Sequence, residues 1–379
     1  MDLSIVVPTY NEQENVEKLV RQLRRVMLAN GLTYEIIFID DSNDETPKVL
    51  QHLSNYYSEV NFFHREGRRG LASAVVDGFL KSQGECIIVM DADLQHPPEM
   101  LSLIMQRLNM ADIVIPSRFV EGGSDGGLHG YRKLISWAAR LIGRFSIRRL
   151  REISDCTGGY FGIRCKVIEG VQLDPIGWKI LIEVLVKGNY ETVHEIPYTF
   201  LARNDGKSKM DLKEQWNYLV HITRLVKSSP EDLRFYSFCL VGLLGVFVNL
   251  FTLTALVKVF GFETVRSSLG ASIIALLHNY VLNERITWRD CKKPIIVRRA
   301  WQLPQFMIVC GFGIAITSLF MQLFISMGWN IYVGQLMGII AATAWNYSAN
   351  NRWTWARSNQ STATRNKMRV TQELPHEIS

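Results

Sequence analysis

Three long stretches without a charged residue constrain this chain more than any other feature of its sequence. They are Phe235–Val257, Leu303–Trp329 and Asn330–Ala349. Each is at least 20 residues long, which is enough for an α-helix to cross the hydrocarbon core of a bilayer. Because residues 1–229 instead mix charged and apolar positions, the sequence predicts a soluble N-terminal domain followed by a membrane domain.

An internal repeat supports a fourth, weaker span. The segment Asn279–Trp288 recurs 67 residues later as Asn346–Trp355, with the same six residue types at matching positions. If the later copy ends a spanning helix, the earlier copy should end one too. We therefore expect a four-helix transmembrane domain over 230–357 and a basic, polar, disordered tail over 358–379. The expected spans are about 235–257, 267–283, 303–329 and 330–350.

The positive charges flanking these spans indicate an orientation. They gather in the loop between the repeats, which contains Arg285, Arg289, Lys292, Lys293, Arg298 and Arg299, and in the tail, which contains Arg357, Arg365, Lys367 and Arg369. Loops with such an excess of lysine and arginine stay in the cytoplasm. The N-terminus also lacks the pattern of a signal peptide. We expect a multi-pass integral membrane protein with its N-terminal domain and both termini cytoplasmic.

The N-terminal domain has the pattern of an α/β fold. Over the first ninety residues, short β-branched runs alternate with amphipathic stretches, which predicts a mostly parallel sheet covered by helices. Polar residues follow three predicted strands, at Pro8–Glu12, Asp40–Ser42 and Asp91–Asp93. Ligands of open α/β sheets bind at such carboxyl ends, so the three turns should line one crevice. The glycine-rich motifs of dinucleotide oxidoreductases and P-loop NTPases are missing.

The turn Asp91–Ala92–Asp93 is a candidate metal site. Two carboxylates at the end of an apolar strand can bind Mg²⁺ or Mn²⁺, which are hard cations that also accept diphosphate oxygens. Such a metal would neutralise the charge that develops on a departing nucleoside diphosphate. An ordinary acidic surface turn is the alternative for an isolated pair, and the two neighbouring polar turns favour the metal.

These turns belong to a longer series of motifs whose order and spacing resemble glycosyltransferase family 2, and within it the dolichol-phosphate mannose synthases, over about residues 1–230. The matching segments are Val7–Glu12, Asp40–Thr46, Gly70–Leu71, Asp91–Pro97, Ser117–Phe119, Arg132–Ser136, Asp155–Phe161 and Pro197–Phe200. The membrane half, with its Asn-x3-Asn repeat, resembles the GtrA-like domain found with lipid-linked sugar pathways. The resemblance implies a GT-A fold in the N-terminal domain.

The resemblance also implies roles for individual residues. It places Asp91, Asp93 and Gln95 around Mg²⁺ or Mn²⁺, and Arg118, Arg132 and Ser136 at the acceptor phosphate. Of these, Asp91, Asp93, Arg118 and Arg132 are the expected catalytic residues. The implied contacts to the donor nucleotide-sugar are Pro8, Tyr10, Glu12, Asp40, Asp91, Ala92, Asp93, Gln95, Arg118, Lys179, Arg203 and Lys209. Asn43 and Glu45 depart from the family, which often has Gly or Pro in that turn.

The activity implied by the resemblance is transfer of one mannose, with inversion, from GDP-mannose to a polyprenyl (dolichyl) phosphate on the cytosolic membrane face. The QxxRW motif of processive relatives is missing, so a single transfer is expected. A phosphate monoester has a second pKa of about 6 and is already an ionised nucleophile at neutral pH, so no strong general base is needed. No residue of the sequence distinguishes the base or the sugar, and UDP-glucose stays open as the donor.

The membrane domain leaves two further questions open. Asn279, Asn283, Asn346 and Asn350 lie near the expected membrane boundary, where polar residues often mark a transport path. A combined synthase and flippase is one interpretation of these residues, and the other is that they cap helix ends. A homo-oligomer formed through this domain is also open.

Two basic amphipathic segments complete the pattern of charge. His129–Arg151 and Met210–Ser228 each place apolar residues at helical spacing beside basic ones, which is typical of helices that lie on a membrane surface. Ordinary helices with a solvated basic face are the alternative. The net charge of +6 suits an anionic partner, and we expect the lipid bilayer, not nucleic acid, because no nucleic-acid-binding motif accompanies the charge.

Overall fold

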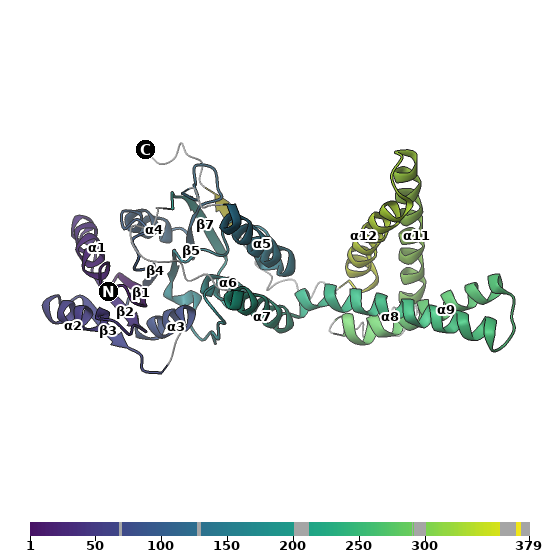
Figure 1. The fold of residues 1–379 in the computed structure, drawn as a ribbon, viewed down its shortest axis with the longest axis horizontal. Coiled ribbons are helices and arrows are strands. Elements are labelled where there is room, and N and C mark those ends of the chain that lie inside the picture. Colours follow the sequence, from purple (N-terminus) through teal and green to yellow (C-terminus); the bar gives the residue numbers. More distant parts are fainter. Residues whose placement is uncertain are drawn as a thin grey trace. The chain divides into compact units, whose positions relative to one another are not determined.

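The computed structural model describes residues 1–67, 70–126, 130–200, 212–289, 291, 301–356 and 369–372, in two separate units (Figure 1). The first unit comprises Met1–Ser228 and Asn366–Ser379. The second comprises Ser229–Arg365. The division therefore falls next to the domain boundary predicted from composition.

The first unit is built on one mixed sheet of eight strands in the order β3-β2-β1-β4-β6-β5-β7-β8. The strands are β1 Leu3–Thr9, β2 Tyr34–Asp40, β3 Val60–His64, β4 Cys86–Val89, β5 Ile113–Ser117, β6 Phe161–Arg164, β7 Thr192–Pro197 and β8 Arg369–Gln372. Only β6 runs antiparallel to its neighbours, β4 and β5. The predicted mostly parallel α/β sheet is confirmed.

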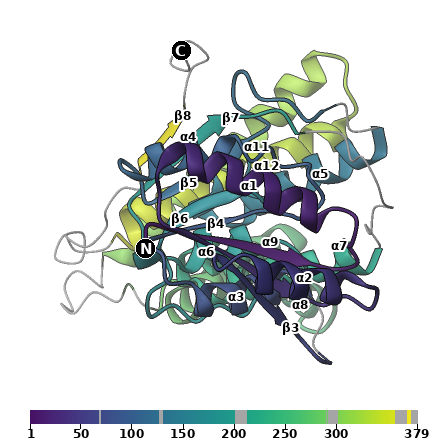
Figure 2. The ribbon, with the colours of Figure 1, turned by 90° about the vertical axis from the view of Figure 1, so that its left-hand side faces the viewer.

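Helices cover both faces of this sheet. They are α1 Val16–Asn30, α2 Thr46–Tyr56, α3 Leu71–Lys81, α4 Met100–Leu108, α5 Gly130–Ser146, α6 Ile180–Lys187 and α7 Leu212–Ser228. Alternate residues of β1 face opposite cores, with Val7 among residues of α1, α2 and α4 and Val6 among residues of α3, α5, α6 and α7. Figure 2 shows α1 and α4 on one side of the strands and α3 and α6 on the other. The buried strands explain the near-continuous apolar runs in the sequence.

One glycine sets how closely a helix approaches the sheet. A Cβ added to Gly78 of α3 would lie 2.3 Å from Cγ1 of Val6 in β1. A side chain at this position would therefore push α3 away from β1.

Strand β8 differs from the sequence-based expectation. The segment 358–379 is predicted to be a disordered tail, but Arg369–Gln372 pairs in parallel with Thr192–Glu195 of β7. The side chain of Gln372 donates a hydrogen bond to Oγ of Ser154 at 2.9 Å. A stretch that follows the second unit in the sequence is therefore part of the first unit's sheet.

The second unit consists of two helical hairpins. The long helices are α8 Pro230–Lys258, α9 Thr264–Leu282, α11 Gln302–Ser326 and α12 Ile331–Ala349, and π-helical turns η3 Asn283–Thr287 and η4 Asn350–Thr354 follow α9 and α12. Within the described residues, α8 and α11 are long and apolar enough to cross a membrane. Spanning by all four helices stays a prediction. The predicted third span ends earlier than expected, because the chain turns at Gly328 with a φ of 74°.

The sequence repeat is also a structural repeat. A Cβ added to Gly245 of α8 would lie 2.2 Å from Oδ1 of Asn279, and one added to Gly313 of α11 would lie 2.7 Å from Nδ2 of Asn346. Within each hairpin, the two helices therefore pack through an equivalent Gly–Asn contact. The rings of Trp288 and Trp355, one from each repeat, stack at 4.3 Å between centroids.

Asn283 and Asn350 lie in the turns that end the two repeats. Oδ1 of Asn283 accepts a hydrogen bond from Thr287, and Oδ1 of Asn350 accepts one from Thr354. Both asparagines are buried, so they stabilise the π-helical turns from inside the unit.

Helices α5 and α7 pack against each other and expose apolar side chains. The hydroxyl of Tyr218 in α7 donates a hydrogen bond to the carbonyl of Ala139 in α5. Trp137 and Phe145 of α5 and Trp216 of α7 are more than half exposed. Exposed aromatic side chains of this size are suited to a membrane surface, and that role of the two helices stays a prediction.

Candidate active site

The turn after β4 is held in a fixed shape by its own residues. Leu94 has a φ of 62°, an unusual conformation for a leucine that curls the chain back after Asp93. The backbone N–H of Gln95 donates a hydrogen bond to Oδ1 of Asp93 at 3.2 Å, and the backbone N–H of Asp91 donates one to Nδ1 of His96 at 3.1 Å. Both carboxylates of the predicted metal site are thus placed at one corner of the sheet edge.

His96 is uncharged and supports this turn by accepting a hydrogen bond from the backbone. Its ring is buried and stacks on Tyr160 at 4.9 Å between centroids. Burial lowers the pKa of His96 to about 4, so the ring is uncharged at neutral pH. Because Nδ1 accepts from the backbone, the ring proton is assigned to Nε2, which lies 3.9 Å from Oδ2 of Asp91.

Asp91 and Asp93 offer this corner oxygen ligands of the kind that a divalent cation takes. A Cβ added to Gly159 would come within 3.2 Å of Oδ2 of Asp91, so the glycine keeps this carboxylate accessible. In the part of the chain that the structure describes, no cluster of three or more His, Cys, Asp or Glu side chains could hold a metal. Mg²⁺ is commonly held by one or two carboxylates together with substrate phosphates and water, so Asp91 and Asp93 fit such a shared site.

Arg118 is held by a buried carboxylate beside this corner. Its Nε lies 2.8 Å from Oδ2 of Asp155, and its Nη2 lies 3.0 Å from Oδ1. Burial alone would raise the pKa of the Asp155 carboxyl, but the ion pair with Arg118 outweighs it and lowers that pKa. The sequence predicts that Arg118 contacts phosphate groups of the substrates. The structure shows that one edge of its guanidinium already has a partner.

Lys179 joins the same group of residues from the start of α6. Its Nζ donates a hydrogen bond to the carbonyl of Thr157 at 3.0 Å. Burial, and next the neighbouring Arg118 guanidinium, lower the pKa of Lys179. The structure thus brings together Lys179 and Arg118, which were both predicted to contact substrate phosphates, and adds Asp155 to them.

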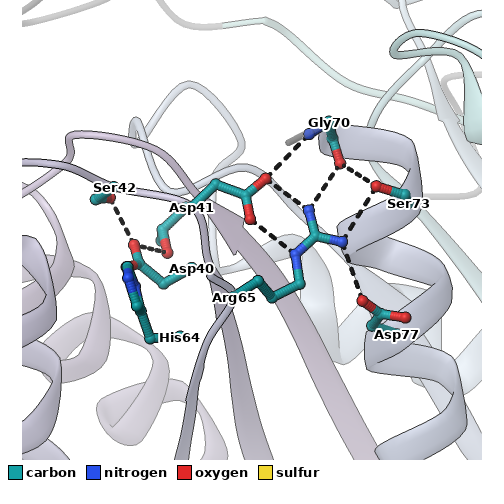
Figure 3. A network of polar contacts seen from close by, with 9 residues as sticks. Asp40, Asp41, Ser42, His64, Arg65, Gly70, Ser73 and Asp77 are labelled. Atoms are coloured by element: carbon teal, nitrogen blue, oxygen red, sulfur yellow. Dashed lines mark hydrogen bonds and ion pairs between the residues drawn. The ribbon is translucent and has the colours of Figure 1, made fainter. Parts of the chain in front are cut away.

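Hydrogen bonds from both neighbouring strands and from the following turn surround Asp40 at the end of β2 (Figure 3). Asp40 is completely buried, and its carboxylate accepts hydrogen bonds from Thr9 at 2.8 Å, Ser42 at 2.5 Å and the Nδ1 of His64 at 2.7 Å. The predicted contact of Asp40 with the nucleotide stays a prediction, and in the structure its carboxylate is already occupied by these three hydrogen bonds. Its carboxylate orients the side chains around it.

Arg65 is a site residue that sequence reasoning missed. Its guanidinium binds Asp41 through Nε at 2.7 Å and Nη2 at 2.5 Å, and reaches Asp77 of α3 through Nη1 at 3.0 Å. The hydrogen bonds to these carboxylates raise the pKa of Arg65 against the opposing effect of burial. The Gly70 amide also donates to Asp41, so Arg65 and Asp41 together fix the start of α3 (Figure 3).

The turn after β1 is bound to the turn after β2. The backbone N–H of Asn11 donates a hydrogen bond to Oγ of Ser42 at 2.7 Å, and the backbone N–H of Glu12 donates one to Oγ1 of Thr46 at 3.0 Å. Tyr10 and Glu12 are half-buried there. The first two of the three predicted turns therefore form one connected structure.

The remaining predicted residues fall in three classes. Pro8 and Ala92 are buried behind the turns that carry them, and Ser136 is half-buried in α5. Arg132 lies in the first turns of α5, but its side chain is outside the described residues. Arg203 and Lys209 also lie outside the described residues.

Comparisons with known proteins cover both units. Residues 4–171 match the glycosyl transferase family 2 domain, and residues 237–355 match the GtrA/DPMS transmembrane domain. Dolichol-phosphate mannosyltransferase of Pyrococcus furiosus is 38% identical over 358 residues, which cover 94% of this chain and 100% of that protein. The enzyme of the same name from Saccharomyces cerevisiae is 32% identical over 236 residues, covering 59% of this chain and 87% of that protein.

Solved structures also resemble part of the chain. A glucosyl-3-phosphoglycerate synthase from Mycobacterium tuberculosis, solved with Mn²⁺, UDP-glucose and phosphoglyceric acid, superimposes with a TM-score of 0.46 and 15% identity. The match covers 60% of this chain and 79% of that one.

Proposed function

The chain belongs to the dolichol-phosphate mannosyltransferases of glycosyltransferase family 2, and from that premise we propose that it transfers one mannose from GDP-mannose to the phosphate of a polyprenyl lipid. The observation that carries this proposal is the match to the Pyrococcus furiosus relative, which extends over that protein's entire length and includes both units. A likeness confined to the first unit would fit many sugar acceptors. The shared membrane unit favours a lipid acceptor.

The acid turn after β4 is the proposed site of the leaving group. Asp91 and Asp93, with the side chain of Gln95, would hold Mg²⁺ or Mn²⁺, which when bound neutralises charge on the departing diphosphate. The hydrogen bond from the backbone N–H of Gln95 holds the Asp93 carboxylate, and the one from the backbone N–H of Asp91 to His96 holds the chain at Asp91, before substrate binds. Such preorganisation avoids reorganisation during the reaction.

Basic residues are proposed to position the two phosphate-bearing substrates. Lys179, with Arg203 and Lys209, would contact the donor phosphates. Arg132 and Ser136 would bind the acceptor phosphate, because forked guanidinium donors match phosphate oxygens. We assign Arg118 a part in both sets through the side of its guanidinium turned away from Asp155.

The proposed reaction is a single in-line displacement. An oxygen of the acceptor phosphate attacks the anomeric carbon of mannose while the bond to GDP breaks, so the configuration at that carbon inverts. The acceptor phosphate is already ionised at neutral pH, and the chain therefore has to aim it and exclude water, not deprotonate it. The products are polyprenyl-phosphate-mannose and GDP, at the cytosolic face of the membrane.

A second candidate function is movement of the product across the bilayer by the membrane unit. Asn283 and Asn350 are buried among otherwise apolar helices, at 2% and 0% exposure, and buried polar residues in membrane segments often serve transport. Their hydrogen bonds to Thr287 and Thr354 offer a purely structural reason for the same residues. Synthesis is therefore the primary proposal.

A direct assay tests the primary proposal. The purified full-length protein is incubated with Mg²⁺ or Mn²⁺, a short polyprenyl phosphate and either radiolabelled GDP-mannose or radiolabelled UDP-glucose. We expect lipid-extractable label from GDP-mannose. Label from UDP-glucose alone would instead establish the glucosyltransferase alternative, and label from neither would refute a polyprenyl-phosphate sugar transferase.

A further inference from the structure

Three side chains form a row across the carboxyl edge of the sheet. Thr9, Asp40 and His64 end three adjacent parallel strands and are paired in register, Thr9 with Asp40 and Asp40 with His64. Residues paired in this way point to the same face of a sheet. The hydroxyl of Thr9 and the Nδ1 of His64 accordingly reach the Asp40 carboxylate, at 2.8 Å and 2.7 Å.

Only one member of this group offers its side chain to a ligand. Asp40, Thr9 and Ser42 are at most 4% exposed, whereas the side chain of His64 is 35% exposed. Because the Asp40 carboxylate accepts from Nδ1, that nitrogen carries the ring proton in the neutral form. The Nε2 nitrogen is then left as a hydrogen-bond acceptor.

The position of His64 relative to the acid turn suits one part of a nucleotide. Strand β3 is separated from β4 by β2 and β1, which at about 4.8 Å per strand is on the order of 14 Å. If the diphosphate lies at Asp91 and Asp93, as the proposed function requires, the nucleoside extends along the edge toward β1, β2 and β3. A neutral acceptor nitrogen is a poor partner for phosphate oxygens, but it can accept from a ring N–H of a base.

We propose that His64 is a specificity-determining residue that recognises the donor's nucleobase by accepting its ring N–H at Nε2. Guanine and uracil carry such an N–H, at N1 and N3, whereas adenine has none. The residue therefore selects against adenine nucleotides. This inference rests on the proposed function, because it takes a nucleoside diphosphate as the ligand of this edge.

Nucleotide binding by the full-length protein tests the inference. Calorimetric titration with Mg²⁺ and GDP, UDP or ADP is compared between the unaltered protein and His64→Ala. We expect the variant to bind the preferred nucleotide about three- to tenfold more weakly, as loss of one hydrogen bond predicts, with ADP affinity unchanged. Equal weakening for GDP, UDP and ADP, or no weakening at all, would overturn the inference.

His64→Asn separates base recognition from support of Asp40. Its amide can still donate to the Asp40 carboxylate, but it lacks the outward ring nitrogen, so it should keep the unaltered protein's thermal stability and bind nucleotide as weakly as His64→Ala. Wild-type affinity in His64→Asn would show that His64 only supports Asp40, and would refute base recognition.

A matched control uses another histidine. His52 on α2 is exposed, stacks on Tyr56 and does not belong to the row of Thr9, Asp40 and His64, so His52→Ala should bind nucleotides normally. If the unaltered protein itself bound neither GDP nor UDP, the proposed donor site would fail, and base recognition with it. Normal nucleotide binding with an unchanged preference in His64→Ala would reject His64 alone.

Discussion

The ion pair between Arg118 and Asp155 allows a sharp prediction about stability. Asp155 is fully buried, and its carboxylate faces the Arg118 guanidinium through two contacts of 2.8 Å and 3.0 Å. Arg118→Ala would leave this carboxylate buried without that partner. Breaking a buried pair in this way costs about 3–5 kcal/mol. At about 2–4 °C per kcal/mol for a unit of this size, the expected fall in melting temperature is roughly 6–20 °C.

Thermal unfolding of the full-length protein in detergent, followed by near-UV circular dichroism, measures the effect. The size of the effect should also depend on pH. In the folded protein the pKa of Asp155 is lowered from 3.8, the ordinary value for an aspartate. The stabilisation by the ion pair is therefore fully present above about pH 4, and it is lost as the pH falls through the lowered pKa. The difference between Arg118→Ala and the unaltered protein should therefore shrink only in strong acid.

A double variant distinguishes support of the fold from contact with substrate. Arg118→Met combined with Asp155→Asn removes both charges, and should recover most of the lost stability because no buried charge is left unpaired. If Arg118 also contacts a substrate phosphate, the double variant stays slow while being stable. A normal melting temperature in Arg118→Ala would refute the reasoning, since it would mean that Asp155 does not need its arginine.

Three further predictions address the metal, the acceptor and the division of labour between the units. Asp93→Asn should lower turnover at least about 100-fold without unfolding the protein, and near-normal turnover with excess Mn²⁺ would contradict a metal role. Arg132→Ala should raise the apparent KM for polyprenyl phosphate far more than that for the nucleotide-sugar, whereas the reverse pattern would move Arg132 to the donor site. A chain ending at Ser228 should still act on a short, water-dispersible acceptor but lose much more rate with a long-chain acceptor in bilayers. No transfer by a folded, nucleotide-binding truncation would show that residues beyond Ser228, in the second unit or in β8, contribute to the active site.

The grouping of the polar turns at one edge of the sheet could be predicted because it depends on local pattern. Parallel strands bring their carboxyl ends to one edge, so the polar turns after β1, β2 and β4 were expected together, and the first two do share hydrogen bonds. Residue type, however, does not give burial. Asp40 reads as an exposed acid in a turn, but it is enclosed by Thr9 and His64 from the neighbouring strands.

Residues whose partners come from distant segments were harder to find. Arg65 is separated by 24 residues from Asp41, and the contact depends on the pairing of β2 with β3, not on any motif. Strand β8 is the extreme case. Its partner β7 precedes it by an entire membrane unit, and its basic, polar sequence contains no long β-branched run, so composition alone indicated a disordered tail.

The stacked rings of Trp288 and Trp355 bear on the predicted spans of the second unit. They join the turns that end the two hairpins, so the end of α9 lies beside the end of α12. Ends that meet in this way are expected where each hairpin crosses a bilayer and returns. Within the described residues, α8 and α11 have the length and hydropathy that spanning needs, and crossing by α9 and α12 as well stays a prediction.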